Sequence, residues 1–340
     1  MIKRILALTL ALLMTIGLFA CGGNTAETEP VETEPTYTQP AEEAKVLKVL
    51  VLGHSLAVDT GHMLNLVAHA EGYESLKLGT LYYSGCELWR HVQYLQGDKR
   101  EYNLYVSSTD EPNRPPEIVE GVTMKEAIRF EYWDVIVMQA GAFELAEDSA
   151  FKNGNIQTIQ AYVNEHKLNP TATFAWHMAW ALPTDNTLRD MYPYPENNPY
   201  YNTYQKLFNE DRAAMYDAIV ACVRDNIVTD GTFEFVIPCG TAMENALSSY
   251  WEENNIHRDY AHATDLARVM TSYVWYCRLV GIDHLDELKL TAIPKAFFKS
   301  MKGTEDYVLT EMDKSIILES INNALANPLQ VTQSQYTTAP

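Results

Sequence analysis

Positive charge is in short supply in this chain. Its 340 residues include 25 Lys and Arg against 45 Asp and Glu, which gives a formal net charge of −20 at pH 7. A surface with this balance repels the phosphate backbones of DNA and RNA, so we exclude nucleic acid as a partner. The hydrophobic content of 47% is enough for one large folded domain, which excludes a disordered protein.

Cysteine is also scarce. Apart from Cys21, the cysteines are widely spread and form no CxxC or other paired metal-ligand spacing: Cys86, Cys222, Cys239 and Cys277. This pattern excludes a disulfide framework and a cysteine-based zinc site. His62 and His69 would share one face of a helix, but no carboxylate or third histidine has a matching spacing. We therefore predict that the protein binds no metal.

Only one apolar run approaches the length of a membrane helix, and it is too short to span a bilayer comfortably. It extends from Ile5 to Phe19 after a basic start at Lys3 and Arg4, which is the pattern of a signal peptide. The letters LFAC at its end are similar to a bacterial lipobox, so residues 1–20 are predicted as a lipoprotein signal peptide and Cys21 as the lipidated residue. The alternative is ordinary cleavage, with Cys21 incidental. Lipidation would make this an exported lipoprotein, anchored to the outer face of the cell membrane or at the cell surface.

Residues 21–44 lack any apolar period. The stretch from Asn24 to Glu43 consists mainly of Thr, Glu and Pro, a composition that cannot bury enough apolar surface to fold. We predict a disordered tether over residues 21–44, between the anchor and a folded domain that begins at residue 45.

The folded part shows a regular alternation of apolar, β-rich runs with amphipathic segments. This alternation predicts an α/β domain with helices on both faces of a parallel sheet in doubly wound order. Five runs are predicted as strands: LKVLVL from residue 47, LKLGTLYY from 76, WDVIVMQ from 133, ATFAWHMAW from 172 and FEFVIP from 233. The helices predicted between them are 60–73, 86–95, 123–130, 156–166 and 204–226.

Two insertions interrupt this alternation, and a further segment follows it. Residues 102–121 are polar and rich in Pro and are predicted as a hairpin. Residues 183–204 contain four tyrosines that would form either a sugar-stacking platform or a packed loop: Tyr192, Tyr194, Tyr200 and Tyr201. Residues 283–340 are predicted as a helical C-terminal extension of the domain at 45–282.

The first predicted strand runs directly into a Gly-His-Ser turn that ends at Ser55. Ligands bind at the carboxyl ends of strands in doubly wound sheets, so Ser55 is either a candidate nucleophile or a turn serine that caps the next helix. A nucleophilic serine needs a histidine base and an acid that orients it. Asp59 and His62 have the Asp-x-x-His spacing but lie on the serine's own helix, so we assign them to helix capping and the surface. Asp259 and His262 have the same spacing after the last strand, just before an amphipathic helix.

With these residues the chain resembles the SGNH or GDSL-type serine hydrolases, whose first block is a strand ending in Gly-Asp-Ser or Gly-Asn-Ser and whose last block is Asp-x-x-His. Residues 53–55 match the first block, Gly85 matches the glycine block, and Asp259 and His262 match the last block. More narrowly, the chain is similar to a branch catalogued as a domain of unknown function in exported proteins of gut-type bacteria. That branch has Gln in its third block, where Gln139 falls.

The resemblance implies a three-layer α/β/α, flavodoxin-like fold and the activity of a serine esterase. Ser55 would attack the ester carbonyl, His262 would take and return the proton, and Asp259 would orient His262. The backbone N–H groups of Ser55 and Gly85 and the side chain of Gln139 would form the oxyanion hole. The implied mechanism needs no cofactor. The implied substrates are acyl esters, above all acetyl esters, of small molecules or glycans.

Two positions depart from the superfamily pattern within the matched span from Val46 to Gly281. His54 stands where an acidic or amide residue is usual, and Gln139 replaces the asparagine that donates to the oxyanion. The alternative function is therefore a catalytically impaired surface lipoprotein that keeps this fold and binds glycans. His54 would either support the oxyanion region or serve the fold, and His177 and Trp180 would either line the pocket or belong to the core.

Overall fold

The computed structural model describes residues 46–339 except 74, 192–207 and 302, and the described residues belong to one compact unit. The predicted signal peptide, the lipidation site Cys21 and the tether lie outside the described residues. So do the four tyrosines of the second insertion: Tyr192, Tyr194, Tyr200 and Tyr201. In the part of the chain that is described, no helix is long and apolar enough to cross a membrane.

A sheet of seven strands lies at the centre, in the order β4-β3-β2-β1-β5-β6-β7. The five predicted strands form its parallel part, in which neighbours pair in the order β2-β1-β5-β6-β7. They are β1 (Leu47–Gly53), β2 (Leu76–Tyr82), β5 (Val135–Met138), β6 (Thr173–His177) and β7 (Phe235–Ile237). This is the doubly wound order of flavodoxin-like folds, so the predicted fold class is confirmed.

The polar insertion at residues 102–121 forms the predicted hairpin and extends the sheet. β3 (Tyr102–Ser108) pairs antiparallel with β2, and β4 (Glu117–Val122) pairs antiparallel with β3. Pro115 and Pro116 lie just before β4, where their missing N–H groups remove no bond from the ladder. The sheet is therefore mixed, with a parallel centre and an antiparallel edge.

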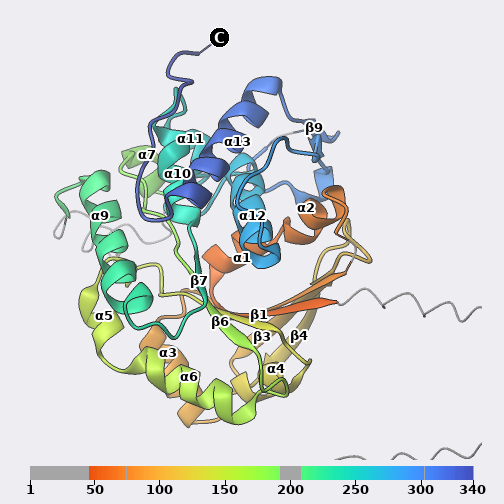
Figure 1. Ribbon diagram of the computed structural model, residues 1–340, viewed down its shortest axis with the longest axis vertical. Coiled ribbons are helices and arrows are strands. Elements are labelled where there is room, and N and C mark those ends of the chain that lie inside the picture. The colour runs from red at the N-terminus through yellow and green to blue at the C-terminus, as the bar shows by residue number, and fades with distance from the viewer. Residues whose placement is uncertain (1–45, 74, 192–207, 302, 340) are drawn as a thin grey trace, which may run out of the picture. The chain divides into compact units, whose positions relative to one another are not determined.

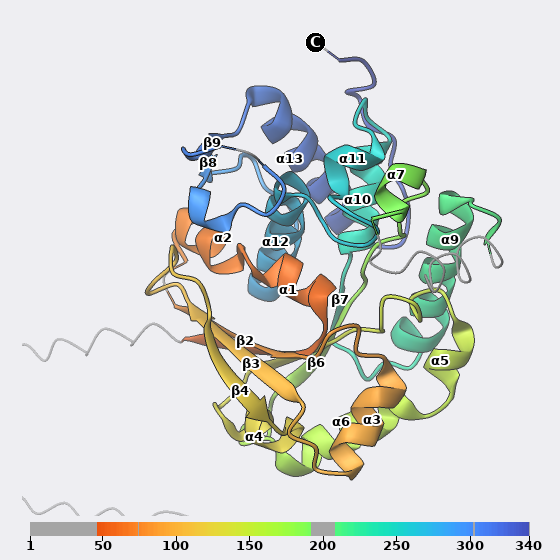
Figure 2. The same cartoon turned by 180° about the vertical axis from the view of Figure 1, so that it is seen from behind.

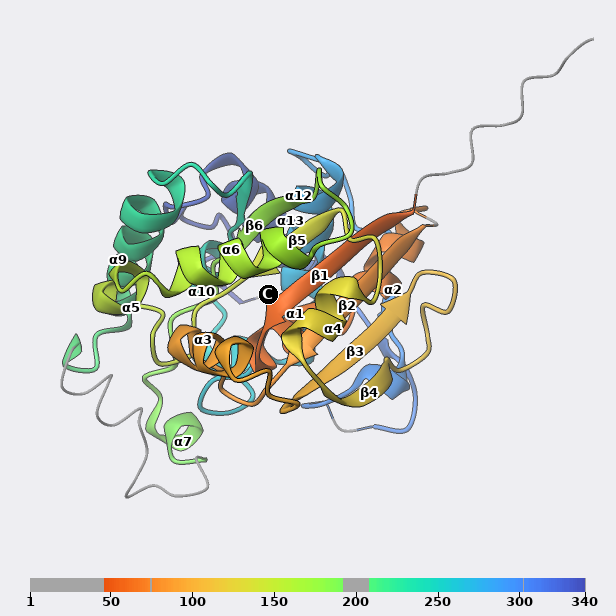
Figure 3. The same cartoon turned by 90° about the horizontal axis from the view of Figure 1, so that it is seen from below.

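Helices cover both faces of the sheet, which gives three layers (Figure 1). One face, seen from below in Figure 3, carries α3 (Leu88–Gln96), α4 (Met124–Arg129) and α6 (Asn155–His166). The other face carries α1 (Ser55–Gly61), α2 (Leu64–Ala70), α10 (Cys239–Leu247), α12 (Asp265–Val280) and α13 (Glu311–Ala326). The remaining elements are α5 (Asp148–Lys152), α7 (Asn186–Arg189), α9 (Arg212–Val223), the π-helix η3 (Arg224–Val228), α11 (Glu253–Ile256), β8 (Ala292–Ile293), the 3-10 helix η4 (Lys295–Phe297) and β9 (Tyr307–Val308).

The central strands are buried on both faces, as their unbroken apolar sequences require. Residues 49–52 of β1 are at most 1% exposed. At Gly79 in β2, a Cβ atom would come within 2.6 Å of the Trp133 ring, so glycine leaves room for this indole. Trp133 is itself buried and donates from Nε1 to the Ala127 carbonyl at 2.9 Å. The sheet and the α3–α4–α6 layer are thus joined by close packing.

The C-terminal extension packs on the same helical layer as α10 and α12, as Figure 2 shows from behind. Ile316, Ile317 and Ile321 of α13 are 0% exposed and belong to the main hydrophobic core. The helix begins with a capping box, in which Thr310 and Asp313 each bond to the backbone N–H of the other. The extension therefore completes the core instead of lying on its surface.

Candidate active site

Ser55 stands at the carboxyl end of β1, as the half-buried first residue of α1. His54, not Ser55, caps this helix, because its Nδ1 atom accepts a hydrogen bond from the Leu56 N–H at 3.4 Å. Its Nε2 atom is 2.9 Å from the Ala140 carbonyl, just beyond β5. Burial lowers the pKa of His54 to about 4, so the ring is neutral at pH 7 and donates through Nε2. His54 thus serves the fold by fastening the serine turn to the neighbouring strand.

Gln139 lies directly behind the serine turn. A Cβ atom on Gly53 would come within 2.9 Å of Gln139 Nε2, so the amide packs against the backbone of Gly53. Gln139 Oε1 accepts a hydrogen bond from His177 Nδ1 at 2.8 Å. Gln139 Nε2 and His177 Nε2 are both buried and have no hydrogen-bond partner among the described residues. The predicted oxyanion donor is therefore shielded from solvent in this conformation, and His177 belongs to the core.

The glycine loop after β2 is fastened to the loop after β5. Gly85 has a φ of +57°, in the left-handed region that favours glycine. Glu144 accepts hydrogen bonds from the N–H groups of Leu88 at 2.8 Å and Gly141 at 3.1 Å. Burial raises the pKa of Glu144 to about 7, although both hydrogen bonds act to lower it. Ser55 and Gly85 follow the carboxyl ends of β1 and β2, which are neighbours in the sheet, and Glu144 holds the glycine loop there.

Asp259 and His262 have the geometry of an orienting acid and a base. His262 Nδ1 is 2.9 Å and 3.1 Å from the two carboxylate oxygens of Asp259, so Nδ1 carries the proton and Nε2 is left to accept one. The same carboxylate accepts hydrogen bonds from the N–H groups of Ala261 and His262. Burial acts to raise the pKa of Asp259, but His262 and these N–H groups lower it to about 2. Asp259 therefore stays ionised at neutral pH.

Residues 258–263, which we call the histidine loop, are fastened on two sides. Asp59 on α1 accepts hydrogen bonds from the Ala263 N–H at 2.9 Å and from Arg258 Nη1 at 3.0 Å. Trp180, just beyond β6, donates from Nε1 to the Ala261 carbonyl at 2.8 Å. Trp180 is 0% exposed, so it supports the loop and does not line a pocket.

The assignment to helix capping and the surface is wrong for Asp59, whereas His62 is the half-buried C-cap residue of α1. Asp59 is 4% exposed, and its partner Arg258 lies 199 residues later in the chain, where local spacing cannot reveal it. The His62 ring packs edge-on against Phe297, with 5.0 Å between the ring centroids. Burial, and then the charge of Arg268, lowers the pKa of His62 to about 3. Asp59 therefore belongs to the interior, and the half-buried His62 ring packs against the interior from the end of α1.

The contacts of Asp59 bring the histidine loop to the helix that Ser55 begins. His262 is near enough to His54, the neighbour of Ser55, for its charge to lower the pKa of His54 further. Within the described part of the chain, no hydrogen bond joins Ser55 to His262. In enzymes without bound substrate such bonds are often long and tighten only in the complex. The structure thus gathers the three predicted residues without closing the triad.

Comparison with known proteins identifies the family. A family model for a domain of unknown function, DUF4886, matches residues 48–291. This chain belongs to the DUF4886 family. The crystal structure of a DUF4886 protein from Bacteroides uniformis has a TM-score of 0.69 and 21% identity, over 86% of this chain and 100% of that one. The matched residues include both the serine turn and the histidine loop. The predicted likeness to a family of unknown function is confirmed, whereas the glutamine of its third block stays a prediction.

Other solved structures are less similar to this DUF4886 chain. A Slackia heliotrinireducens protein, provisionally assigned as an SGNH hydrolase, has a TM-score of 0.41 and 13% identity over 68% of this chain and 98% of that one. An acetyl xylan esterase has a TM-score of 0.37 and 12% identity over 68% of this chain and 99% of that one. No curated protein matches the chain.

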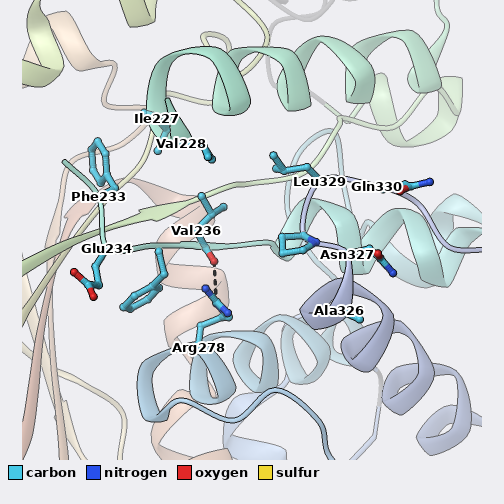
Figure 4. A pocket seen from close by; sticks show the side chains of 12 residues that line it. Ile227, Val228, Phe233, Glu234, Val236, Arg278, Ala326, Asn327, Leu329 and Gln330 are labelled. Atoms are coloured by element: carbon cyan, nitrogen blue, oxygen red, sulfur yellow. Dashed lines mark hydrogen bonds between the residues drawn. The ribbon is translucent and has the colours of Figure 1, made fainter. Parts of the chain in front are cut away.

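Two cavities of about 640 Å³ each contain neither the candidate nucleophile nor the candidate base. One lies between β7, η3 and the chain after α13, and Figure 4 shows Arg278 in it, donating from Nε to the Val236 carbonyl at 3.1 Å. The other borders Asp259 and lies between the histidine loop and residues 299–301. The first cavity is thus unrelated to the site, and the second lies next to its acid.

The side chains that could bind a metal form no such site in the described part of the chain, where no three His, Cys, Asp or Glu residues are grouped to hold an ion. The four described cysteines are free and buried: Cys86, Cys222, Cys239 and Cys277. None of these four cysteines forms a disulfide in the described part of the chain.

Proposed function

We propose that this DUF4886 protein is an exported, lipid-anchored serine esterase that hydrolyses acyl esters, with acetyl groups on glycans as its substrates. The supporting observation is the pair of Asp259 and His262, joined through Nδ1 at 2.9 Å on a loop fastened to the helix that begins at Ser55. An imidazole held in this way keeps Nε2 available as a base. A serine at the carboxyl end of a strand is the group that such a base would activate.

In the proposed reaction, Ser55 Oγ adds to the ester carbonyl carbon while His262 Nε2 takes the hydroxyl proton. The tetrahedral intermediate then breaks its bond to the alcohol, which leaves with the proton returned by His262. Water repeats the sequence on the acyl group held by Ser55 and releases the free acid. Asp259, ionised because its pKa is lowered to about 2, stabilises the imidazolium that forms in each half of the reaction.

The developing oxyanion would be met by the backbone N–H groups of Ser55 and Gly85. One donor aimed at this oxygen can contribute about 3 kcal/mol to transition-state stabilisation. Direct donation from Gln139 Nε2 stays a prediction, because that atom is buried against Gly53. The observed contacts of Gln139 support the turn from behind.

A second candidate is a glycan-binding lipoprotein with the same fold and no turnover. Two observations favour it: no hydrogen bond joins Ser55 to His262 among the described residues, and Gln139 Nε2 is shielded from solvent. A fluorophosphonate probe separates the two candidates, because it modifies only an activated serine. Labelling of the wild-type protein at Ser55 supports the esterase.

The first prediction concerns hydrolysis of p-nitrophenyl acetate. Ser55→Ala and His262→Ala should each lower kcat by about 10³-fold or more, and Asp259→Ala somewhat less, because triad members act as a unit and their losses do not add. His69→Ala, which removes an exposed histidine of α2, is the matched control and should retain wild-type kcat. If esterase activity persisted in Ser55→Ala, Ser55 would not be the nucleophile and would serve only the turn.

A further inference from the structure

Asp59 is a buried carboxylate that the proposed mechanism does not use. Its side chain is 6% exposed and lies on α1, one helical turn after Ser55. Each of its oxygens is 3.0 Å from Arg258 Nη1, and Oδ2 accepts a hydrogen bond from the Ala263 N–H at 2.9 Å. Arg258 and Ala263 are the first and last residues of the histidine loop. One carboxylate therefore holds both ends of the loop that carries the candidate base.

The two ends of the histidine loop are also joined to each other. Arg258 Nη1 donates to the Ala263 carbonyl at 2.6 Å, and the Arg258 N–H donates to the His262 carbonyl at 2.9 Å. The loop therefore keeps its own shape, and the contacts with Asp59 fix where it lies on α1.

A second pair of charges completes this cluster. Arg268 of α12 is 1% exposed, and its Nε atom is 3.7 Å from Asp59 Oδ1 while its Nη1 atom is 2.9 Å from Asp265. The guanidinium groups of Arg258 and Arg268 thus pair with the carboxylates of Asp59 and Asp265, and Arg258 Nε is also 3.7 Å from Asp259. Removing one of these buried charges leaves a partner uncompensated, so the remaining groups would move.

The C-terminal extension is fastened to the same cluster. Asp265 accepts hydrogen bonds from the N–H groups of residues 299–301 at distances between 2.9 Å and 3.2 Å. Arg268 Nη1 donates to the Phe297 carbonyl at 2.9 Å. The extension, to which the sequence assigns no function, thus supports the charges that hold the histidine loop.

We propose that Asp59 is a positioning residue, whose carboxylate sets the separation between Ser55 and His262 by holding the histidine loop on the serine's own helix. This inference rests on the proposed esterase function. Because the nucleophile and Asp59 share one short helix, any shift of the loop relative to Asp59 changes the distance between nucleophile and base directly. A displacement of about 1 Å can lower a reaction rate by about 10²-fold.

The test replaces Asp59 in the full chain by Asn and compares it with a matched control. Asp59→Asn should lower kcat for p-nitrophenyl acetate by about 10-fold to 100-fold, with KM changed less than about threefold, and should slow fluorophosphonate labelling by a similar factor. The control is Glu71→Gln. Glu71 has the same side-chain exposure of 6% and also accepts hydrogen bonds from residues far along the chain, the Tyr273 hydroxyl and the Lys289 N–H. The control variant should keep wild-type kcat, even if its melting temperature falls as far as that of Asp59→Asn.

Hydrogen exchange of the peptide spanning residues 257–264 gives a readout that does not depend on activity. Asp59→Asn should speed exchange of these amides by at least about 10-fold, and Glu71→Gln should not, because only the first variant replaces the carboxylate that accepts from Arg258 and the Ala263 N–H by a neutral amide with a single acceptor oxygen. If Asp59→Asn fails to fold, Arg258→Ala tests the same loop, since it removes both the donor to the Ala263 carbonyl and the charge that pairs with Asp59, and it should show the same two effects. Wild-type kcat together with wild-type loop protection would overturn the inference. A wild-type protein that does not react with the probe would refute the esterase, while the exchange data would still decide the role of Asp59.

Discussion

Among single residues, half-buried Asp259 and buried Glu144 show how two carboxylates with similar backbone bonds come to have pKa values shifted in opposite directions. Each accepts hydrogen bonds from two backbone N–H groups. Asp259 also contacts His262, and its pKa is lowered to about 2. Glu144 has no histidine partner of this kind, so burial dominates and raises its pKa to about 7. The acid beside the base is therefore charged at neutral pH, and the one behind the glycine loop is partly protonated.

This difference predicts how stability depends on pH. The folded state holds the Glu144 proton more tightly than the unfolded state, so the stabilising contribution is fully present below the ordinary value of 4.5 and is lost as pH rises through 7. The loss can reach about 3 kcal/mol. Glu144→Gln cannot ionise and should show no such loss. Its stability relative to the wild type should rise between pH 5 and pH 8, as measured by denaturant unfolding at both values.

Glu120→Gln is the control for this experiment, because Glu120 is an exposed carboxylate on β4. Its stability difference from the wild type should be the same at both pH values. If the free energy of unfolding of the wild type and of Glu144→Gln changed in parallel with pH, ionisation of Glu144 would not destabilise the folded state, and the prediction would be wrong.

Among the helices, α13 packs against α10 and α12, and this packing predicts that removing the C-terminal extension destabilises the fold. A chain that ends at residue 282 would expose the faces of α10 and α12 that now cover Ile316, Ile317 and Ile321. Burying one such side chain contributes about 1.5–3 kcal/mol, so losing three approaches the whole stability of an ordinary domain. We expect the truncated chain to lose its cooperative thermal transition, measured by circular dichroism. Removing only residues 337–340 should leave the transition nearly unchanged, and a sharp transition in the longer truncation would show that the extension is dispensable.

The elements also show what could be predicted from the sequence and what could not. Strands such as β1 and β5 follow from unbroken apolar runs. The pairing of Asp259 with His262 follows from their spacing only together with the family resemblance, because Asp59 and His62 have the same spacing and Asp59 bonds to the histidine loop instead. The role of Asp59 does not follow from the sequence, because its partners come 199 and 204 residues later. One local signal was available: Asp59 follows Leu56, Ala57 and Val58 in a short apolar helix, where an unpaired carboxylate would be costly. No comparable pattern in the sequence indicates that Trp180 supports the histidine loop or that Glu144 supports the glycine loop.

For the protein taken as a whole, we propose that the folded esterase is held on a membrane by a lipid anchor. In this proposal, anchoring would depend on acyl chains attached to Cys21, because the net charge of −20 gives the chain no attraction to an anionic membrane surface. We predict that the wild-type protein enters the detergent phase in a Triton X-114 partition and that Cys21→Ala does not. A wild-type protein found wholly in the aqueous phase and cleaved elsewhere would end the lipoprotein proposal.

The contact between Asp59 and the histidine loop also has a consequence for the order of folding. The bond from the Ala263 N–H to Asp59 closes a sequence separation of 204 residues, and Asp265 then takes partners 34 to 36 residues further on. Contacts of such high order form late, because much chain entropy is lost before they contribute. For the proposed esterase, a growing chain that has already made the serine helix would therefore carry the candidate nucleophile without its base, and hydrolytic activity would require the chain to have emerged at least as far as residue 301.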